Sequence, residues 1–326
     1  MGRKASIVLL VTLALASVDV AEAQQPKKVP RIGRLSAGFL GVSTVRDEAL
    51  KQGLRDLGYI EGKNILIETR YAEGKPDRYP TLVAELVRLK IDVLVTASGP
   101  ARAAKQVSNT LPIVVVGTTD PLATGLVESL ARPGGNITGL TSLAPDLGGK
   151  RLELLKETVP KLSRVAFLYN PADPSNVVEL EQLRGPAAAL GVTVRVVEAR
   201  GPDEIEQAFS VMSRERLEGL STASGAVNNN NQRRIVVLAA KNRLPAIYHL
   251  SEFVDSGGLM SYGPNLGEMY RRAAYFVDRI LKGAKPSDLP VEQPTKFELL
   301  INLKTAKALG LTIPPVVMMR AEKVIK

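Results

Sequence analysis

The sequence predicts an α/β protein of two similar Rossmann-like lobes, each built on a parallel sheet covered by helices. Strand-like and helix-like segments alternate along the chain from residue 31 onward. The tetrapeptide Thr-Ala-Ser-Gly occurs at 96–99 and again at 222–225, each time between an apolar run and a helical pattern. The neighbouring strand-like runs also correspond between the halves, 31–35 with 164–168, 64–68 with 192–196, and 111–116 with 244–248. Two related halves with small hydroxyl loops at strand ends predict a ligand held in a cleft between the lobes.

The first lobe is expected to begin with a strand at 31–35. Residues 44–57 should follow as a helix, because their apolar positions share one helical face and Gly58 suits the left-handed position after a helix end. Residues 91–95 are almost continuously apolar, as expected for a strand covered on both faces. By the same reasoning we expect strands at 65–71 and 113–116 and helices at 79–89, 100–108 and 122–130.

The second lobe repeats this alternation. Residues 150–159 should open it as a helix that Pro160 stops. After the chain crosses back to the first lobe, residues 265–281 should form a long helix with one apolar stripe. We expect strands at 165–169, 192–198, 217–220, 246–248 and 297–303, and helices at 178–190, 202–212 and 232–241.

Three extended passages are expected to connect the lobes, at 136–141, 257–262 and 286–294. They divide the mature chain into a first lobe of residues 30–142 plus 262–288 and a second lobe of residues 143–261 plus 289–326. Such a multi-strand hinge favours closure of the two lobes about the cleft.

Residues 1–23 have the features of a cleavable export signal. Arg3 and Lys4 provide the positive start, residues 7–16 are apolar apart from one threonine, and Ala-Glu-Ala at 21–23 is a small-x-small cleavage site. The apolar run is too short to span a bilayer. The chain has no cysteine, which excludes disulfides, cysteine metal sites and a lipidated cysteine anchor. We therefore expect a periplasmic protein that is not lipidated.

The net charge of +10 does not point to nucleic acid. Basic residues are dispersed among acidic neighbours, no basic run or helix-turn-helix segment occurs, and aromatic residues make up only 4% of the chain. Phosphate-loop, dinucleotide-loop and zinc-protease patterns are also missing from the sequence. We therefore predict a solvated basic surface, no nucleic-acid partner, no cofactor, no metal site and no catalytic residue.

The loops after the strands supply the candidate ligand-binding residues, because ligands of open α/β sheets bind at the carboxyl ends of the strands. Ser98 and Ser224 lie in the two hydroxyl loops, where helix amides and a hydroxyl can hold a carboxylate together. The alternative is that each serine only caps its helix. Gly99 follows Ser98 in the first hydroxyl loop, and the first loops of the two lobes complete this group with Ser36, Gly38 and Asn170.

A second group of candidates would recognise an ammonium group. Asp120, with Thr118 and Thr119 before it, follows a predicted strand and can accept a hydrogen bond from an ammonium group, which with an anion-binding serine would suit a zwitterion. The alternative for Asp120 is a turn in which its carboxylate bonds to nearby backbone amides. Glu252 is a further acceptor that could take its place.

Three tyrosines fall near predicted cleft positions in a chain with no tryptophan. Tyr169, Tyr248 and Tyr262 would form walls for a flat ligand and offer phenolic hydrogen bonds, unless they pack at the strand ends. His249 is the single histidine and has no acid, thiol or metal partner in the pattern, so we expect a surface or loop residue. The asparagines at 228–231 are expected to form a solvated loop and helix cap.

Several phrases occur in an order that resembles the ABC-transporter substrate-binding family that includes the tryptophan-binding TrpX-like proteins. They are LGYIEGKN at 57–64, AELV at 84–87, LARPGGNITG at 130–139, KRLELLK at 150–156, GLMSYG at 258–263 and PVEQPTK at 290–296. The resemblance covers essentially the whole mature chain. It implies a periplasmic-binding-protein type I fold and delivery of a small solute to an ABC permease in the inner membrane.

The leading hypothesis is therefore a monomeric, non-enzymatic binding protein for an ABC importer. It would hold a small polar solute, an amino acid or related carboxylate with an aromatic side chain as one option, between hinged lobes. Two alternatives stay open at this stage. One is an exported ligand sensor for a membrane receptor, and the other is a two-lobed hydrolase or racemase, against which the missing nucleophile motif argues.

Overall fold

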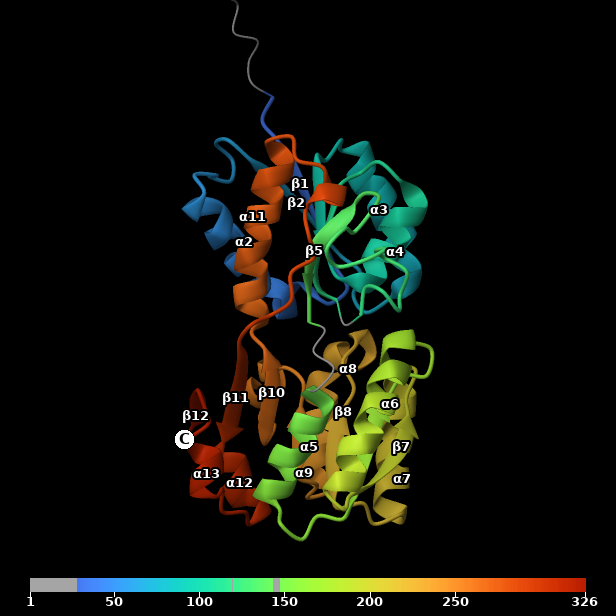
Figure 1. Ribbon diagram of the computed structural model, residues 1–326, viewed down its shortest axis with the longest axis vertical. Helices are drawn as coiled ribbons and strands as arrows, with labels where there is room; N and C mark the ends of the chain where they lie inside the picture. Colours follow the sequence, from blue (N-terminus) through green and yellow to red (C-terminus); the bar gives the residue numbers. More distant parts are fainter. Residues whose placement is uncertain (1–27, 119, 143–146) are drawn as a thin grey trace, which may run out of the picture.

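The computed structural model describes residues 28–118, 120–142 and 147–326 and has two lobes, one above the other in Figure 1. The expected export signal at 1–23 and the candidate Thr119 lie outside the described residues. The elements are β1 (Arg31–Ser36), α2 (Leu40–Asp56), β2 (Leu66–Tyr71), η1 (Pro76–Arg78), α3 (Tyr79–Arg88), β3 (Val93–Thr96), α4 (Ser98–Val107), β4 (Ile113–Thr118), β5 (Ile137–Thr141), α5 (Leu147–Thr158), β6 (Arg164–Tyr169), α6 (Pro174–Ala189), β7 (Thr193–Glu198), α7 (Pro202–Arg214), β8 (Gly219–Thr222), α8 (Ala226–Asn230), α9 (Gln232–Lys241), β9 (Ala246–Tyr248), α10 (Ser251–Asp255), β10 (Met260–Pro264), α11 (Leu266–Leu281), η2 (Pro286–Asp288), β11 (Phe297–Asn302), α12 (Leu303–Leu309), α13 (Pro315–Met318) and β12 (Lys323–Ile325).

The first lobe is built on a parallel sheet of five strands in the order β2-β1-β3-β4-β5. Helices α2 and α11 cover one face of this sheet, and α3 and α4 cover the other (Figure 1). All four residues of β3 are buried, as the continuous apolar run predicts. Residues 137–141, which we expect only as a passage between lobes, form strand β5 beside β4 before the chain leaves the lobe.

The second lobe repeats the strand order of the first. Its seven strands run β12-β11-β10-β9-β8-β6-β7, so β7-β6-β8-β9 corresponds to β2-β1-β3-β4. The internal repeat predicted from the sequence is thereby confirmed. The pairing is parallel throughout except between β10 and β11, where the chain returns antiparallel.

The chain crosses between the lobes slightly later than the sequence predicts. Residues 262–264 still belong to β10 and pair with β11 in the second sheet. Residues 291 and 292 still bond to the first lobe, since the amide of Val291 donates to Leu130 O and that of Glu292 to Gly139 O. The later crossings therefore lie near residues 265 and 293, not at 262 and 289.

The helix expected at 122–130 does not form. Gly125 adopts φ of +64°, which lies outside the helical region, and the amides of Leu126 and Val127 both return to Pro121 O. The amide of Glu128 donates instead to Pro133 O. These turns supply the hydrogen bonds of the backbone in place of a helix. The apolar spacing in the sequence instead reflects the burial of Leu126 and Val127 beneath a turn.

Helices α2 and α11 approach each other at Gly53. A Cβ atom added there would lie 2.2 Å from the backbone oxygen of Arg271 and 2.9 Å from Ala274 Cβ. We expect Gly53→Ala to lower the free energy of unfolding by about 1–2 kcal/mol, because overpacking against a backbone outweighs the gain in helix propensity. Urea unfolding measures the change.

Gly185 provides the matched control for this prediction. It lies in α6, is exposed, and a Cβ atom there would meet nothing within 4 Å. The same substitution should leave stability unchanged or raise it by up to about 1 kcal/mol. Equal changes in the free energy of unfolding of the two variants would show that the close approach of α2 and α11 at Gly53 does not determine the loss of stability.

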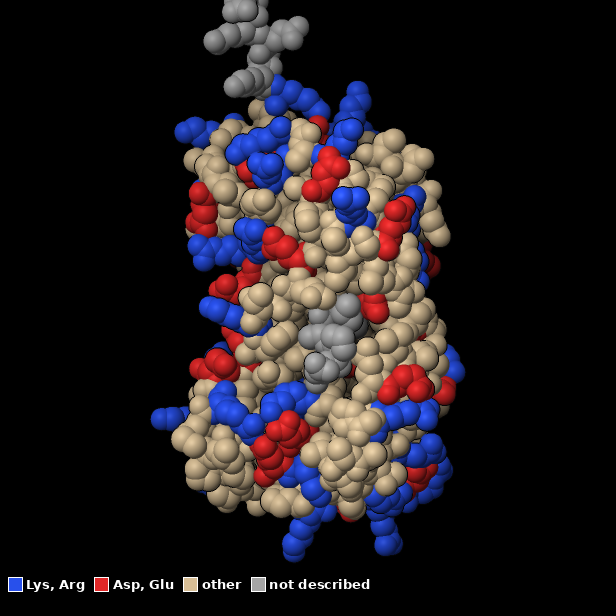
Figure 2. Space-filling view, viewed as in Figure 1, with Lys and Arg blue, Asp and Glu red and all other residues tan. Residues whose placement is uncertain are grey.

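Charged residues of both signs are interspersed over both lobes on the face shown in Figure 2. Among the helices that the structure describes, none has the length and apolar character needed to cross a membrane.

Candidate functional site

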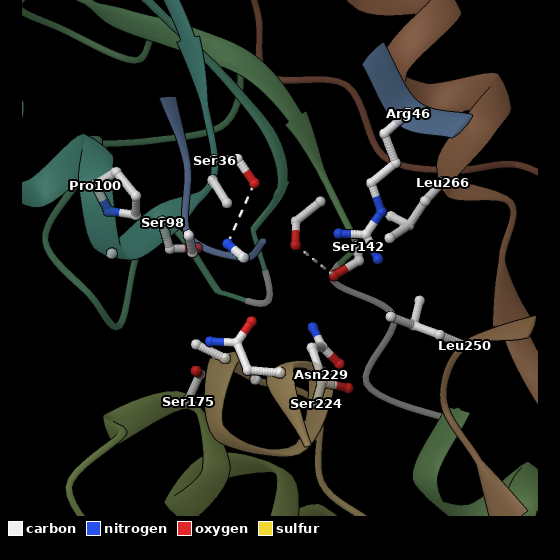
Figure 3. Close-up of a pocket in the computed structure, with 18 of the residues that line it drawn as sticks. Ser36, Arg46, Ser98, Pro100, Ser142, Ser175, Ser224, Asn229, Leu250 and Leu266 are labelled. Carbon is white, nitrogen blue, oxygen red and sulfur yellow. Dashed lines mark hydrogen bonds between the residues drawn. The ribbon is translucent and has the colours of Figure 1, made fainter. Parts of the chain in front are cut away.

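A cavity of about 190 Å³ lies between the lobes, at the carboxyl ends of strands from both sheets. Figure 3 shows side chains converging on it from the two sides, with Ser36 and Ser98 from the first lobe and Ser175, Ser224 and Asn229 from the second. Five residues predicted from the sequence line this cavity, namely Ser36, Gly38, Ser98, Gly99 and Ser224. The two repeated Thr-Ala-Ser-Gly loops therefore face the same space from opposite lobes.

Neither repeated serine caps its helix. Ser98 is the first residue of α4, whose N-cap position is occupied by Ala97 and has no side-chain cap bond. The hydroxyl of Ser98 bonds to the hydroxyl of Thr118 instead. At α8 the N-cap is Gly225, again without a side-chain cap. The backbone amides of Ser98 and Gly99, at the start of α4, therefore have no capping side chain, and both residues line the cavity. Free amides at a helix N-terminus are what an anion site requires.

Four arginines line the cavity, and three of them are held by carboxylates. Arg34, which is 2% exposed, donates from Nε to Asp47 Oδ1 at 3.0 Å and from Nη2 to Tyr270 Oη at 3.2 Å. Tyr71 donates to the other oxygen of Asp47 at 2.9 Å, and burial and this bond raise the pKa of Tyr71 to about 12. This network fixes the first-lobe wall and neutralises the Arg34 charge.

A second buried pair sets the position of the Ser224 loop. Arg151 on α5 bonds to Glu179 on α6, and Glu179 Oε2 accepts the backbone N–H of Ser224 at 2.9 Å. Both side chains are at least nine-tenths buried. Arg151 Nε has no hydrogen-bond partner among the described atoms, so this guanidinium is incompletely satisfied.

The third pair joins the lobes directly. Arg46 on α2 donates from Nη2 and Nε to Glu252 Oε1 on α10, at 2.8 and 3.2 Å. Glu252, expected to accept a ligand ammonium, thus binds Arg46 and does not line the cavity. The pair spans the cleft beside the cavity and stabilises the arrangement in which the lobes are in contact.

Asp173 is the one carboxylate among the described residues that line the cavity. Its Oδ1 caps α6 by accepting the N–H of Ser175 at 3.1 Å and the Ser175 hydroxyl at 2.5 Å. Its Oδ2 lies beside Gly225 and accepts no hydrogen bond from any residue in the described ranges. This oxygen is available to a cationic group in the cavity.

Three residues expected to contact the ligand have structural roles. Asp120 Oδ1 accepts the N–H groups of Leu122 and Ala123 at 3.0 and 2.9 Å, which is the turn-forming alternative. Thr118 is fully buried, and its Oγ1 bonds to Ser98 behind the cavity wall. Asn170 accepts the amide of Ala172 in a similar local turn.

The three predicted tyrosines do not line the cavity either. Tyr248 is 1% exposed and stacks on Phe253 with ring centroids 4.6 Å apart. Tyr169 and Tyr262 pack beside Phe167 and Phe297 at 6.3 and 6.2 Å. All three lie within strands, where side chains point to the faces of the sheet and so meet the covering helices.

His249, expected at the surface or in a loop, lies in the bend after β9 but is buried there. It is 4% exposed and lines the second-lobe side of the cavity between Thr222 and Asn229. Asn228, expected in a solvated loop, is 3% exposed and donates to Leu168 O and Ala223 O. The asparagine run is thus a structural part of α8 and of the cavity wall.

The tyrosines that do line the cavity come from helices. Tyr79 begins α3, and Tyr270 lies in α11. The apolar stripe of α11 does not indicate in the sequence which of its residues lines a cavity. Asp173 carries the one signal that sequence reasoning missed, because Asp-Pro-Ser at 173–175 follows a strand and opens a helix.

His249 links stability to pH. Burial, with the positive charges of Arg151 and Arg46, lowers the pKa of its imidazole well below the ordinary value of 6.5. The unfolded chain takes up this proton near that value and the folded protein does not. The stabilising contribution is therefore complete above about pH 6.5 and is lost as the pH falls further, by at most about 1.4 kcal/mol per pH unit. Urea unfolding of wild type and His249→Gln across this range should give a shallower slope for the variant. Parallel slopes would contradict the assignment.

Two sheet-containing lobes with several crossings and a cavity at facing strand ends define the class of hinged, two-lobed binding proteins with the periplasmic-binding-protein type I fold. The family described as ABC transporter substrate binding protein matches residues 44–325. The chain belongs to this family.

The chain is similar in sequence to one curated relative and in structure to two solved proteins. A tyrosine-binding protein of Clostridioides difficile is 28% identical over 262 residues, which cover 80% of this chain and 75% of the relative. The crystal structure of an ABC domain from Streptococcus pneumoniae in complex with L-Trp is 26% identical with a TM-score of 0.85, covering 91% of this chain and 99% of that one. A conserved domain protein from Vibrio cholerae has the same TM-score at 28% identity, covering 91% of this chain and 100% of its own.

Proposed function

We propose that this protein is the extracytoplasmic solute-binding component of an ABC importer and that its solute is an aromatic α-amino acid. The observation that carries the proposal is the composition of the cavity between the lobes. It combines one carboxylate, Asp173, with hydroxyl and helix-amide donors at Ser98 and Gly99.

The charges around the cavity suit a zwitterion. Arg34, Arg46 and Arg151 are each paired with a carboxylate, so they add little net charge. Arg102 is exposed and has no carboxylate partner among the described residues, so it adds one positive charge that would attract the ligand's carboxylate. Asp173 Oδ2 is available for an ammonium group, and the first amides of α4 are available for a carboxylate. A ligand with both groups would use both donors and acceptors, whereas a simple carboxylate would leave Asp173 without a partner in the closed cavity.

The size and walls of the cavity suit one small ligand with a flat apolar part. A volume of about 190 Å³ holds a single small molecule. Tyr79, Pro100, Leu250 and Leu266 provide apolar surface around it. The names of the relatives, one tyrosine-binding and one bound to L-Trp, support an aromatic side chain in this position.

Hinge closure would bury the ligand and bring Arg46 to Glu252, so the closed form presents a surface made from both lobes. We propose that an inner-membrane ABC permease recognises this surface and that no chemical step occurs on the ligand. The export signal predicted at residues 1–23 and the absence of cysteine from the sequence support a periplasmic protein without a lipidated cysteine. We propose that it acts as a monomer.

A thermal-shift screen of the mature protein, refolded to remove co-purified solute, tests the proposal. At about 100 times its dissociation constant a ligand adds about 2.7 kcal/mol to the stability, which is readily detected. We expect L-tryptophan or L-tyrosine to raise the melting temperature and indole-3-propionate, which lacks the ammonium group, to have little effect. An equal rise in melting temperature with indole-3-propionate would contradict recognition of the ammonium group. A rise with sugars alone would exclude amino acids as the solute class. Amino-acid uptake by cells lacking the protein tests delivery separately.

A further inference from the structure

The single histidine is held in a defined hydrogen-bond chain within the second lobe. His249 Nδ1 lies 3.1 Å from Thr222 Oγ1, and its Nε2 lies 2.6 Å from Asn229 Oδ1. The ring also packs against Phe253, with centroids 5.4 Å apart. Thr222 ends β8 and Asn229 lies in α8, so the imidazole bridges the two elements that carry the second hydroxyl loop.

These contacts determine which nitrogen carries the proton. Burial and the charges of Arg151 and Arg46 lower the pKa of His249, so the ring is neutral and has one N–H. The carboxamide oxygen Oδ1 only accepts hydrogen bonds, which places that N–H on Nε2. Nδ1 is then an acceptor, and the hydroxyl of Thr222 donates to it.

The orientation of the Asn229 amide follows from this chain. Its oxygen is occupied by His249, so its NH₂ group is the part left for the cavity. Asn229 lines the cavity, and Figure 3 shows its side chain directed into it. The NH₂ group donates to no residue in the ranges that the structure describes. An amide turned the other way would present its oxygen to the ligand and repel a carboxylate.

We infer that His249 is a positioning residue that holds the Asn229 carboxamide with its NH₂ group toward the ligand, where it donates to the ligand's carboxylate. This inference rests on the proposed function. The second lobe would then offer an acceptor at Asp173 and a donor at Asn229, which match the ammonium and carboxylate groups of one amino acid. Ligands without an oxygen acceptor at that place lose this contact.

The tautomer can be measured without any ligand. Because the chain contains one histidine, ¹⁵N-histidine labelling of the protein, prepared without a histidine tag, gives the signals of His249 alone. Nε2 is identified by its couplings to both ring carbon-bound protons, and Nδ1 by its coupling to one. We expect the directly bonded proton on Nε2. A proton on Nδ1 would overturn the inference whatever the protein binds.

Binding variants test the role of the amide. Asn229→Asp replaces the NH₂ group by an oxygen, and calorimetry should show binding of L-tryptophan weakened by about tenfold or more. Tryptamine, which lacks the carboxylate, should bind the variant no less tightly than it binds wild type. Asn242→Asp makes the same charge change on the exposed end of α9 and should leave both affinities unchanged. Unweakened binding of L-tryptophan by Asn229→Asp would overturn the inference.

Two substitutions of the histidine separate positioning from packing. His249→Phe fills the space but cannot fix the amide, so the preference for L-tryptophan over tryptamine should fall by about five- to tenfold. His249→Gln can still donate to Asn229 and should restore most of that preference. Loss of the preference in neither variant would contradict the positioning role. If wild type binds no amino acid, the proposed function fails and the ligand role of Asn229 fails with it, while the tautomer still reports the hydrogen-bond chain.

Discussion

Replacing Asp173 with asparagine is expected to weaken the binding of an aromatic amino acid by about one hundredfold, or about 2.7 kcal/mol. The substitution removes the charge that would pair with the ligand ammonium. It keeps an oxygen that can accept the N–H of Ser175, so the cap of α6 should persist. Calorimetry with L-tryptophan and with indole-3-propionate measures the change, and only the amino acid should lose affinity.

Asp120→Asn is the matched control for this prediction. Asp120 also caps a turn through one oxygen and lies in the first lobe outside the cavity lining. The same loss of charge there should change the affinity by less than about threefold. Equal losses in both variants would mean that general electrostatics, and not contact at Asp173, determines binding.

Arg151→Met is expected to lower the free energy of unfolding by about 3–5 kcal/mol, the largest effect on stability. The substitution leaves Glu179 buried without its cation, and desolvation already raises the pKa of this carboxyl above its ordinary value. Glu179 also holds the backbone of Ser224, so the second hydroxyl loop should lose its fixed position. Urea unfolding should show the lower free energy of unfolding, and calorimetry should show weaker binding of the amino acid.

The double variant Arg151→Met with Glu179→Gln separates charge burial from packing. Glutamine removes the unpaired charge and keeps an oxygen for the N–H of Ser224. We expect it to recover at least half of the stability lost in the single variant. No recovery would show that Arg151 acts through its packing and its contact with Tyr262 O.

The fold could be predicted from the sequence because its signals are local and occur twice. The repeated Thr-Ala-Ser-Gly loops and the paired apolar runs identify β1, β3 and β4 with β6, β8 and β9, and the two sheets do have matching strand orders. The failures lie where tertiary contacts decide the backbone. Residues 122–130 form turns because Gly125 leaves the helical region. Residues 137–141 join a sheet whose other four strands lie earlier in the chain.

The candidate site could be predicted only in part, for a geometrical reason. Ser36, the last residue of β1, and Ser98 and Ser224, two residues beyond β3 and β8, do line the cavity. Tyr169 and Tyr248 are also the last residues of their strands, but their rings pack against Phe167 and Phe253 instead. Asp120 and Asp173 look alike in the sequence, because each is followed directly by a proline. Only the approach of Gly225, which precedes α8 in the loop after β8, distinguishes Asp173 from Asp120.

Helix α11 has a consequence for the order of events during synthesis. It covers one face of the first sheet beside α2, and its apolar residues Met269, Phe276 and Val277 are fully or nearly fully buried there. The first lobe therefore lacks part of its core until residue 281 has emerged from the ribosome, although its last strand ends at 141. The second lobe likewise waits for β11 and β12 near the end of the chain.

Neither lobe can thus reach its folded state while most of the chain is still being made. A polypeptide that must be threaded through a narrow membrane pore benefits from this delay, because it stays extended until its last segments arrive. For the exported, hinged protein proposed above, the discontinuous lobes would thus delay folding until the chain has crossed the membrane.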